Sequence, residues 1–117
     1  MTLESLSAVT VATGDLDASV RFYEALGFQR HYVHEDFASF RLNGVYINLA
    51  YRKGYQSFGN WGRMIFYVDD VDAMYNKCIT EGLSPDTQPR NAEWHERYFH
   101  ITDPSGHELS FAKPLSR

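Results

Sequence analysis

A chain of 117 residues with 44% apolar and 22% charged residues is typical of one globular domain and is too short for two independent cores. The net charge of −4 with scattered basic residues argues against a nucleic-acid surface, and the single Cys78 excludes a disulfide framework and a cysteine-based zinc cluster. The sequence shows no signal-peptide pattern and no run of about 20 apolar residues, so we expect a cytoplasmic protein without a membrane-spanning helix.

The first half of the chain predicts a strand, a helix and three further strands. Residues 6–12 alternate in the manner of a half-buried strand. Asp15 is placed to cap a helix whose apolar residues recur at helical spacing, and Gly27 is placed to end it. The further strands are predicted near 29–34, 37–42 and 45–51. An Asn-Gly pair between the last two predicts a tight hairpin.

The same order of elements returns in the second half. The segment 63–68 alternates as a strand, Asp70 is placed to cap a second helix, and Gly82 is placed to end it. The segment 85–91 is predicted to be a loop. The closing strands are predicted at 98–102 and 108–112.

These correspondences define an internal repeat. An offset of 55 aligns Asp15 with Asp70, and a larger offset of 62 later aligns Gly44 with Gly106, so the second copy has a longer loop. We therefore predict an α+β fold of two tandem βαβββ modules. The predicted parts of this single domain, residues 1–117, are a first module at about 6–53, a connection at about 54–62 and a second module at about 63–113.

Two parts of the repeat resemble one known superfamily. Residues 11–28 (VATGDLDASVRFYEALGF) resemble the opening of the vicinal oxygen chelate superfamily, which includes glyoxalase I, extradiol dioxygenases and the fosfomycin- and bleomycin-resistance proteins. Residues 68–72 (VDDVD) and 103–106 (DPSG) resemble its second module. The resemblance covers residues 6–114. It implies that the modules form a U-shaped, partly closed mixed sheet around a cleft, with the helices outside.

The resemblance also identifies where metalloenzyme members of the superfamily hold a metal ion. Their ligands lie on the first and last strands of each module, which corresponds here to Ala8, Asn48, Arg63 and Ser110. Ala8 has no donor atom, Arg63 repels a cation, and the other two are weak neutral ligands. A shifted alignment would bring in only Glu108. We therefore expect no metal and no cofactor.

The five histidines are potential metal ligands or catalytic groups. His31 and His34 are three residues apart in a predicted strand, which predicts opposite faces and exposed rings. His107 alternates with the apolar residues of the last strand and is expected on the helix side. His100 has the parity of the cleft residues, so His100 and Glu108 are the candidate catalytic groups. A His100 that is hydrogen-bonded to a neighbouring carbonyl or carboxylate for structural reasons is the simpler alternative.

The candidate ligand-binding residues combine inward parity with polar or aromatic side chains. They are Arg41, Asn48, Trp61, Arg63, Tyr67, Trp94, Tyr98, His100 and Glu108. Arg63 is the most informative, because an unpaired inward cation in a core strand would cost several kcal/mol. It must therefore meet either an anionic ligand or a carboxylate such as Glu108, and the sequence leaves both alternatives open.

Three functions are compatible with these features. We favour a binding protein that has lost the metal site and sequesters an aromatic or amphipathic small molecule, since eight Tyr, eight Phe and two Trp are too many rings to bury completely in one small domain. The alternative is a lyase, isomerase or dioxygenase-type enzyme, either metal-independent through His100 and Glu108 or with metal ligands elsewhere. The third is a partner-binding module. We expect a homodimer, because a partly closed sheet leaves strand edges to cover.

Overall fold

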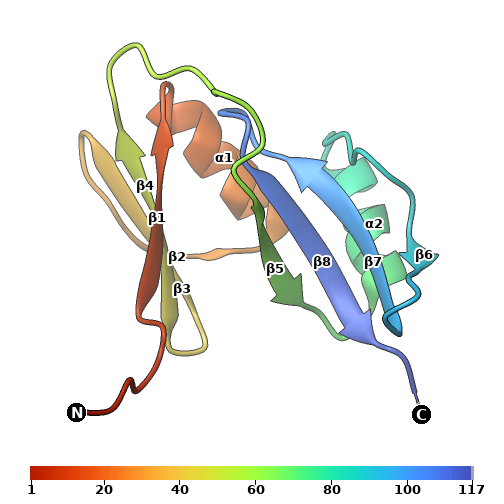
Figure 1. The fold of residues 1–117 in the computed structure, drawn as a ribbon. Helices are drawn as coiled ribbons and strands as arrows, with labels where there is room; N and C mark the ends of the chain where they lie inside the picture. Colours follow the sequence, from red (N-terminus) through yellow and green to blue (C-terminus); the bar gives the residue numbers. More distant parts are fainter. Residues whose placement is uncertain (117) are drawn as a thin grey trace. The chain divides into compact units, whose positions relative to one another are not determined.

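The computed structural model describes residues 1–116, which divide into two compact units, Met1–Gln56 and a second unit that begins at Ser57. The first unit contains β1 (Ala8–Thr13), α1 (Leu16–Leu26), β2 (Gln29–Val33), β3 (Phe37–Leu42) and β4 (Val45–Tyr51) (Figure 1). The second contains β5 (Arg63–Tyr67), α2 (Val71–Thr80), β6 (Arg90–Asn91), β7 (Glu96–Thr102) and β8 (Glu108–Pro114). The prediction of two tandem βαβββ modules is confirmed.

Each module has one four-stranded mixed sheet, with strand orders β1-β4-β3-β2 and β5-β8-β7-β6. In both, the first strand pairs in parallel with the last, and the other pairs are antiparallel. The registers repeat as well. Ala8 lies opposite Tyr46 in the first module, and Arg63 lies opposite Glu108 in the second, so the offsets of 55 and 62 apply to the paired strands.

Both helices begin with the same cap. The Asp15 carboxylate accepts a hydrogen bond from the backbone N–H of Ala18, and Asp70 accepts one from Ala73, which satisfies an N–H that the helix itself leaves unpaired. Gly27 ends α1 with a left-handed φ of 104°. Among residues 1–116, no helix is long and apolar enough to cross a membrane.

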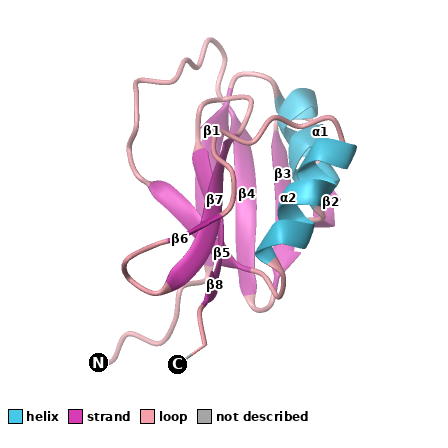
Figure 2. Cartoon of the chain, turned by 90° about the vertical axis from the view of Figure 1, so that its right-hand side faces the viewer, coloured by secondary structure: helices cyan, strands magenta, loops and turns pink. Residues whose placement is uncertain are grey.

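Each helix packs on one face of its own sheet (Figure 2). In the first module the ring of Tyr23 stacks 5.7 Å from that of Phe40, and in the second the ring of Tyr75 meets Phe99 edge-on at 5.4 Å. Tyr23, Phe40 and Phe99 are fully buried. Because strand residues alternate between faces, the residues between these apolar positions lie on the helix-free face of each sheet.

Beyond small shifts of strand ends, three differences from the prediction affect the site. A short strand, β6, occupies the end of the predicted loop 85–91, and β7 begins two residues earlier than expected. In β2 the register shifts between Arg30 and Tyr32, which makes His31 an extra, bulged residue. The rings of His31 and His34 then both contact Tyr32, at 5.0 and 4.8 Å. The alternation that placed these two histidines on opposite faces was therefore wrong, although both are exposed as expected.

Candidate functional site

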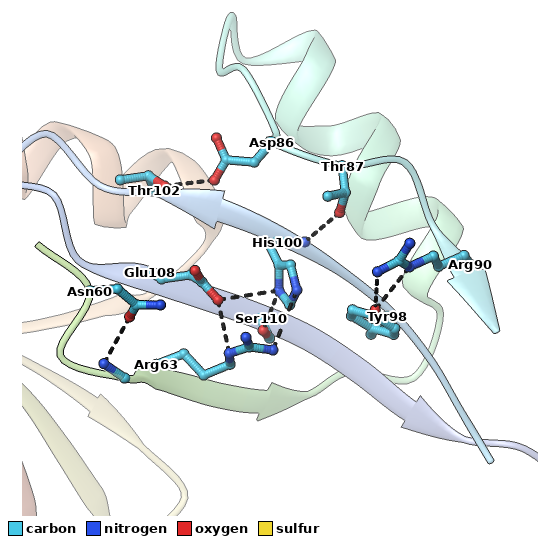
Figure 3. Close-up of polar contacts among 11 residues, drawn as sticks. Asn60, Arg63, Asp86, Thr87, Arg90, Tyr98, His100, Thr102, Glu108 and Ser110 are labelled. Atoms are coloured by element: carbon cyan, nitrogen blue, oxygen red, sulfur yellow. Dashed lines mark hydrogen bonds and ion pairs between the residues drawn. The ribbon is translucent and has the colours of Figure 1, made fainter. Parts of the chain in front are cut away.

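Four polar side chains meet on the helix-free face of the second sheet (Figure 3). They come from three neighbouring strands: Arg63 from β5, His100 from β7, and Glu108 and Ser110 from β8. The register places Arg63 opposite Glu108 and His100 opposite Ser110. Since all four have the same parity, their side chains emerge on one face, and we call them the polar cluster.

The first contact of the polar cluster is an ion pair. Nε of Arg63 lies 2.8 Å from Oε2 of Glu108, and the two side chains are 38% and 23% exposed. The N–H does not point at the oxygen, so Oε2 of Glu108 is buried without a hydrogen-bond donor among residues 1–116. Glu108 therefore supplies the counter-charge that the sequence required for Arg63. The ion pair lacks the hydrogen bond that would strengthen it.

The second contact fixes the proton position on His100. Its Nε2 lies 3.4 Å from Nη1 of Arg63. Because a guanidinium nitrogen can only donate, Nε2 must be the acceptor. The proton then sits on Nδ1, which donates to the Ser110 hydroxyl at 2.6 Å. Burial lowers the pKa of His100 and the nearby Arg63 lowers it further, against the raising effect of Glu108. His100 is thus a neutral imidazole, and Ser110 is not activated as a nucleophile because its oxygen receives a proton donor.

Residues of the segment 85–91 hold β7 in place beside this cluster (Figure 3). The Thr87 hydroxyl accepts a hydrogen bond from the backbone N–H of His100 at 3.1 Å, and the backbone N–H of Asp86 donates to the carbonyl of His100 at 2.9 Å. Thr102 donates from its hydroxyl to the Asp86 carboxylate at 2.6 Å. These bonds satisfy the backbone of His100 at an edge of the sheet and so fix where its ring points.

Aromatic rings continue the face beyond His100. The Tyr98 ring lies 4.9 Å from the imidazole of His100 and 5.4 Å from the indole of Trp94. Its hydroxyl accepts hydrogen bonds from Nε and Nη2 of Arg90, at 2.8 and 2.6 Å. Tyr98 is buried, with the Arg90 guanidinium over its ring, whereas Trp94 is exposed, so Trp94 presents the apolar surface of this region to water.

Glu96 joins this surface to β5. Its carboxylate accepts hydrogen bonds from the Trp94 indole N–H at 3.2 Å and from the Tyr67 hydroxyl at 2.5 Å. The hydrogen bond to Glu96 raises the pKa of Tyr67, because it stabilises the protonated phenol. We call Tyr67, Trp94 and Tyr98 the aromatic shelf. The sequence identified all three rings, and it missed Arg90 and Glu96.

The signal for Glu96 was present but unused. It alternates with Tyr98 and His100, so extending the closing strand by two residues would have placed it on the same face. Arg90 offered no such signal, because its position depends on the two-residue strand β6 inside a stretch with loop composition.

Three predicted site residues lie elsewhere. Trp61 donates its indole N–H to Nδ1 of the buried His107 at 2.8 Å, and His107 has the opposite parity to Glu108. Trp61 is therefore not brought to the polar cluster. Asn48 and Arg41 lie on the helix-free face of the first sheet, where Asn48 donates to the Thr10 hydroxyl at 3.2 Å and Arg41 is exposed.

Two mixed sheets built from paired βαβββ modules, each with a helix on one face and polar or aromatic residues on the other, define a known class of proteins. The chain belongs to the Glyoxalase/Bleomycin resistance protein/Dioxygenase superfamily, whose family model matches residues 5–111. This result confirms the resemblance found in the sequence.

Similar proteins carry several names. A bleomycin resistance protein of Geobacillus stearothermophilus is 31% identical over 97% of this chain and 98% of that protein. The metallothiol transferase FosB of Lysinibacillus sphaericus is 27% identical over 95% of this chain and 83% of that protein. Among solved structures, a glyoxalase/bleomycin resistance protein/dioxygenase from Nocardioides superposes with a TM-score of 0.84 at 20% identity, over 99% of this chain and 87% of that one. A bleomycin-binding protein in complex with bleomycin gives 0.77 at 19% identity, over 98% and 100%. These structural similarities support the fold.

The four residues that the resemblance assigns to metal ligation lack strong ligand atoms in the structure. Ala8 has no ligating atom, and Arg63 is cationic and pairs with Glu108. Asn48 donates to Thr10, and Ser110 accepts from His100. Among residues 1–116, no group of three or more His, Cys, Asp or Glu side chains is placed to hold a metal ion.

Proposed function

We propose that this protein binds or sequesters a small molecule that carries an acidic group on a planar, apolar body, and that it does so without the superfamily's metal site. The observation that carries the proposal is Arg63, a cation at a metal-ligand position. His100 connects Arg63 to the aromatic shelf, because its ring contacts both Arg63 and Tyr98. A charged contact and an apolar surface therefore lie next to each other on the second sheet.

The guanidinium of Arg63 has donors to spare. Nε faces Glu108 and Nη1 faces His100, whereas Nη2 has no hydrogen-bond partner within the described part of the chain. A ligand carboxylate would receive charge-assisted hydrogen bonds there, which are about twice as strong as neutral ones. The exposed rings of Tyr67 and Trp94 would pack against the apolar body. Neutral His100 adds no charge of its own, so selectivity for an acidic ligand comes from Arg63.

A matched pair of probes tests this proposal. Naphthoate and naphthamide have the same ring system and differ in charge, and calorimetric titration gives the affinity of each. We expect naphthoate to bind at least about tenfold more tightly, since one charge-assisted contact contributes about 1.5 kcal/mol or more. The backbone amide signals of His100 and Tyr98 should shift on binding. Equal affinities, or shifts confined to other residues, would contradict the proposal.

Bleomycin is a second probe, because the relatives include proteins named for resistance to it or for binding it. The same titration with bleomycin asks whether the ligand of those proteins is also a ligand of this one. Competition between bleomycin and naphthoate would place both on the second sheet. Independent binding would place bleomycin at another site. The naphthoate titration alone would then test the acidic-ligand proposal.

A metal-independent lyase or isomerase is the second candidate function. It is favoured by the lowered pKa of His100, which keeps this imidazole unprotonated and able to act as a base. The lone pair of Nε2 faces Arg63, so a substrate acid group would have to draw Arg63 away first. Turnover of a bound acidic ligand that is lost in His100→Asn, with binding retained, would establish this activity.

The first prediction concerns metal content. Because the donor set at the four metal positions lacks any carboxylate, thiolate or imidazole, we expect less than stoichiometric zinc, nickel or manganese in protein expressed with each metal added. Elemental analysis measures this directly. One equivalent of any metal, lost on substituting Asn48, Ser110 or Glu108, would show that the site is functional after all.

The second prediction is that the protein is a homodimer. The strands β1 and β2 of the first sheet and β5 and β6 of the second each have one unpaired edge within their own module, and proteins usually cover such edges. Sedimentation equilibrium should give twice the chain mass of 13.5 kDa. A monomer at micromolar concentration and above would refute the prediction.

The cytoplasmic location, the lack of a nucleic-acid partner and the module limits remain predictions from the sequence.

A further inference from the structure

The segment 57–62, which leads into β5, is attached to the turn that precedes β8. The indole N–H of Trp61 donates to Nδ1 of His107 at 2.8 Å, and the two rings meet edge-on at 5.8 Å. His107 is 4% exposed, whereas Trp61 is 43% exposed. Within residues 1–116, this is the only side-chain hydrogen bond from the segment to another part of the chain. We call Trp61 and His107 the indole clamp.

The turn that carries His107 is held by its own hydrogen bonds. The buried Asp103 carboxylate accepts from the backbone N–H groups of Ser105 and His107, both at 2.9 Å. The backbone N–H of Asp103 in turn donates to the carbonyl of His107 at 2.8 Å. The same turn contacts the start of the segment, because a Cβ atom added at Gly106 would lie 2.6 Å from the side chain of Ser57. The turn therefore holds the segment at both ends.

The indole clamp lies next to the ion pair of the polar cluster. Trp61 is two residues before Arg63, and His107 is one residue before Glu108. Since β5 and β8 run parallel and their first pair is Arg63 with Glu108, the clamp joins the same two segments just before the strands begin. It therefore fixes the distance between the chains that carry the two charges.

Arg63 depends on such a connection because of its place in the sheet. It is the first residue of β5, whose one neighbour within the sheet is β8, and the ends of edge strands open readily. The bond from the Gly62 backbone N–H to Oδ1 of Asn60, at 2.8 Å, shapes the chain directly before Arg63 but joins neighbours only (Figure 3). A Cα atom two residues from Trp61 can lie at most about 7 Å from it. Holding Trp61 thus limits where the Arg63 side chain starts.

We propose that Trp61 is a positioning residue that acts through Arg63, and that the indole clamp determines how strongly the protein prefers acidic to neutral ligands. This inference rests on the proposed function, in which Arg63 binds the acid group. A guanidinium that is held beside Glu108 and His100 before binding loses less conformational freedom when the ligand arrives. Trp61 contributes in this way without touching the ligand.

Trp61→Phe tests this role, because it keeps a ring beside His107 and removes the N–H donor. We expect naphthoate to bind at least about threefold more weakly, and naphthamide to stay within about 1.5-fold of the wild-type affinity, since only the charged probe uses Arg63. Phe58→Leu is the control in the same segment, because Phe58 is 80% exposed, and it should change neither affinity. Equal losses for both probes in Trp61→Phe, or no loss for naphthoate, would overturn the proposal.

A measurement without ligand separates this inference from the proposed function. The Nε2 signal of His100 reports its contact with Arg63, and Arg63→Met supplies the signal that lacks this contact. At neutral pH the signal in Trp61→Phe should move toward that of Arg63→Met, while Phe58→Leu keeps the wild-type signal. An unchanged signal in Trp61→Phe would refute the positioning role. Failure of naphthoate to bind the wild-type protein would contradict the proposed function, and the His100 signal would still decide the role of Trp61.

The wild-type protein offers a second test that needs no variant. If the indole clamp and the ligand favour the same position of Arg63, each must stabilise the other by linkage. With naphthoate at about ten times its Kd, hydrogen exchange of the Trp61 indole N–H should slow at least about twofold. An exchange rate that stays the same with naphthoate bound would contradict the proposal.

Discussion

The variant Gly106→Ala is expected to lose about 3 kcal/mol of unfolding free energy, for two reasons that add. Gly106 has a φ of +92°, in the left-handed region that a residue with a Cβ atom adopts only at a cost of about 1–2 kcal/mol. An added Cβ would also lie 2.6 Å from Cβ and Oγ of Ser57. Because the clash involves the first atom of that side chain, the backbone of the connection must move. Denaturant titration measures the loss.

Two further variants separate the contributions. Gly82 has a φ of +79°, and an added Cβ there would meet no atom within 4 Å, so Gly82→Ala should show the conformational cost alone, about 1 kcal/mol. Ser57→Gly in the Gly106→Ala background should recover the part due to the clash. If Gly106→Ala were no more destabilising than Gly82→Ala, the contact between Ser57 and Gly106 would have no energetic role.

The variant Arg63→Met is expected to reduce naphthoate affinity at least about tenfold, since it removes the only charge proposed to bind the ligand. Its effect on stability should be small. A buried brace would have cost roughly 3 kcal/mol on the estimate from sequence alone. The Arg63 side chain is 38% exposed, however, so solvent screens the ion pair and we expect a loss of about 1 kcal/mol or less. Lys113→Met is a control that removes a cation of β8 outside the polar cluster.

A double-mutant cycle with Glu108→Gln measures the ion pair itself. Coupling of Arg63 and Glu108 should be below about 1 kcal/mol in the ligand-free protein. The pKa of His100 is an independent measure: it should rise in Arg63→Met, because Arg63 lowers it, and fall further in Glu108→Gln, because Glu108 raises it. Strong coupling together with unchanged naphthoate affinity in Arg63→Met would establish a brace and defeat the ligand role.

Local patterns in the sequence were sufficient to predict the fold. The caps at Asp15 and Asp70 and the alternation of each strand depend on neighbouring residues, so they can be recognised from sequence. The same alternation correctly placed Arg63 on one face with Glu108 and His100, because a strand without bulges preserves parity.

Features that depend on distant partners could not be predicted in this way. The bulge at His31 depends on how β2 pairs with β3, and one inserted residue reverses the parity of everything on its far side. The place of Trp61 depends on a hydrogen bond to His107, 46 positions along the chain. The sequence singled out both residues as candidates. Their neighbours could not be predicted, because they are set by the tertiary structure.

The contacts of the connection between the modules determine where halves of two such chains could be joined. Tyr55 belongs to the first module, where its carbonyl oxygen would lie 2.9 Å from a Cβ added at Gly14. Ser57 and Trp61 belong to the second, through Gly106 and His107. The contacts of the connection therefore change from the first compact unit to the second after Gln56. A chimaera joined there would keep every one of these contacts, whereas a junction placed a few residues later would combine a serine and a tryptophan from one parent with a glycine and a histidine from another.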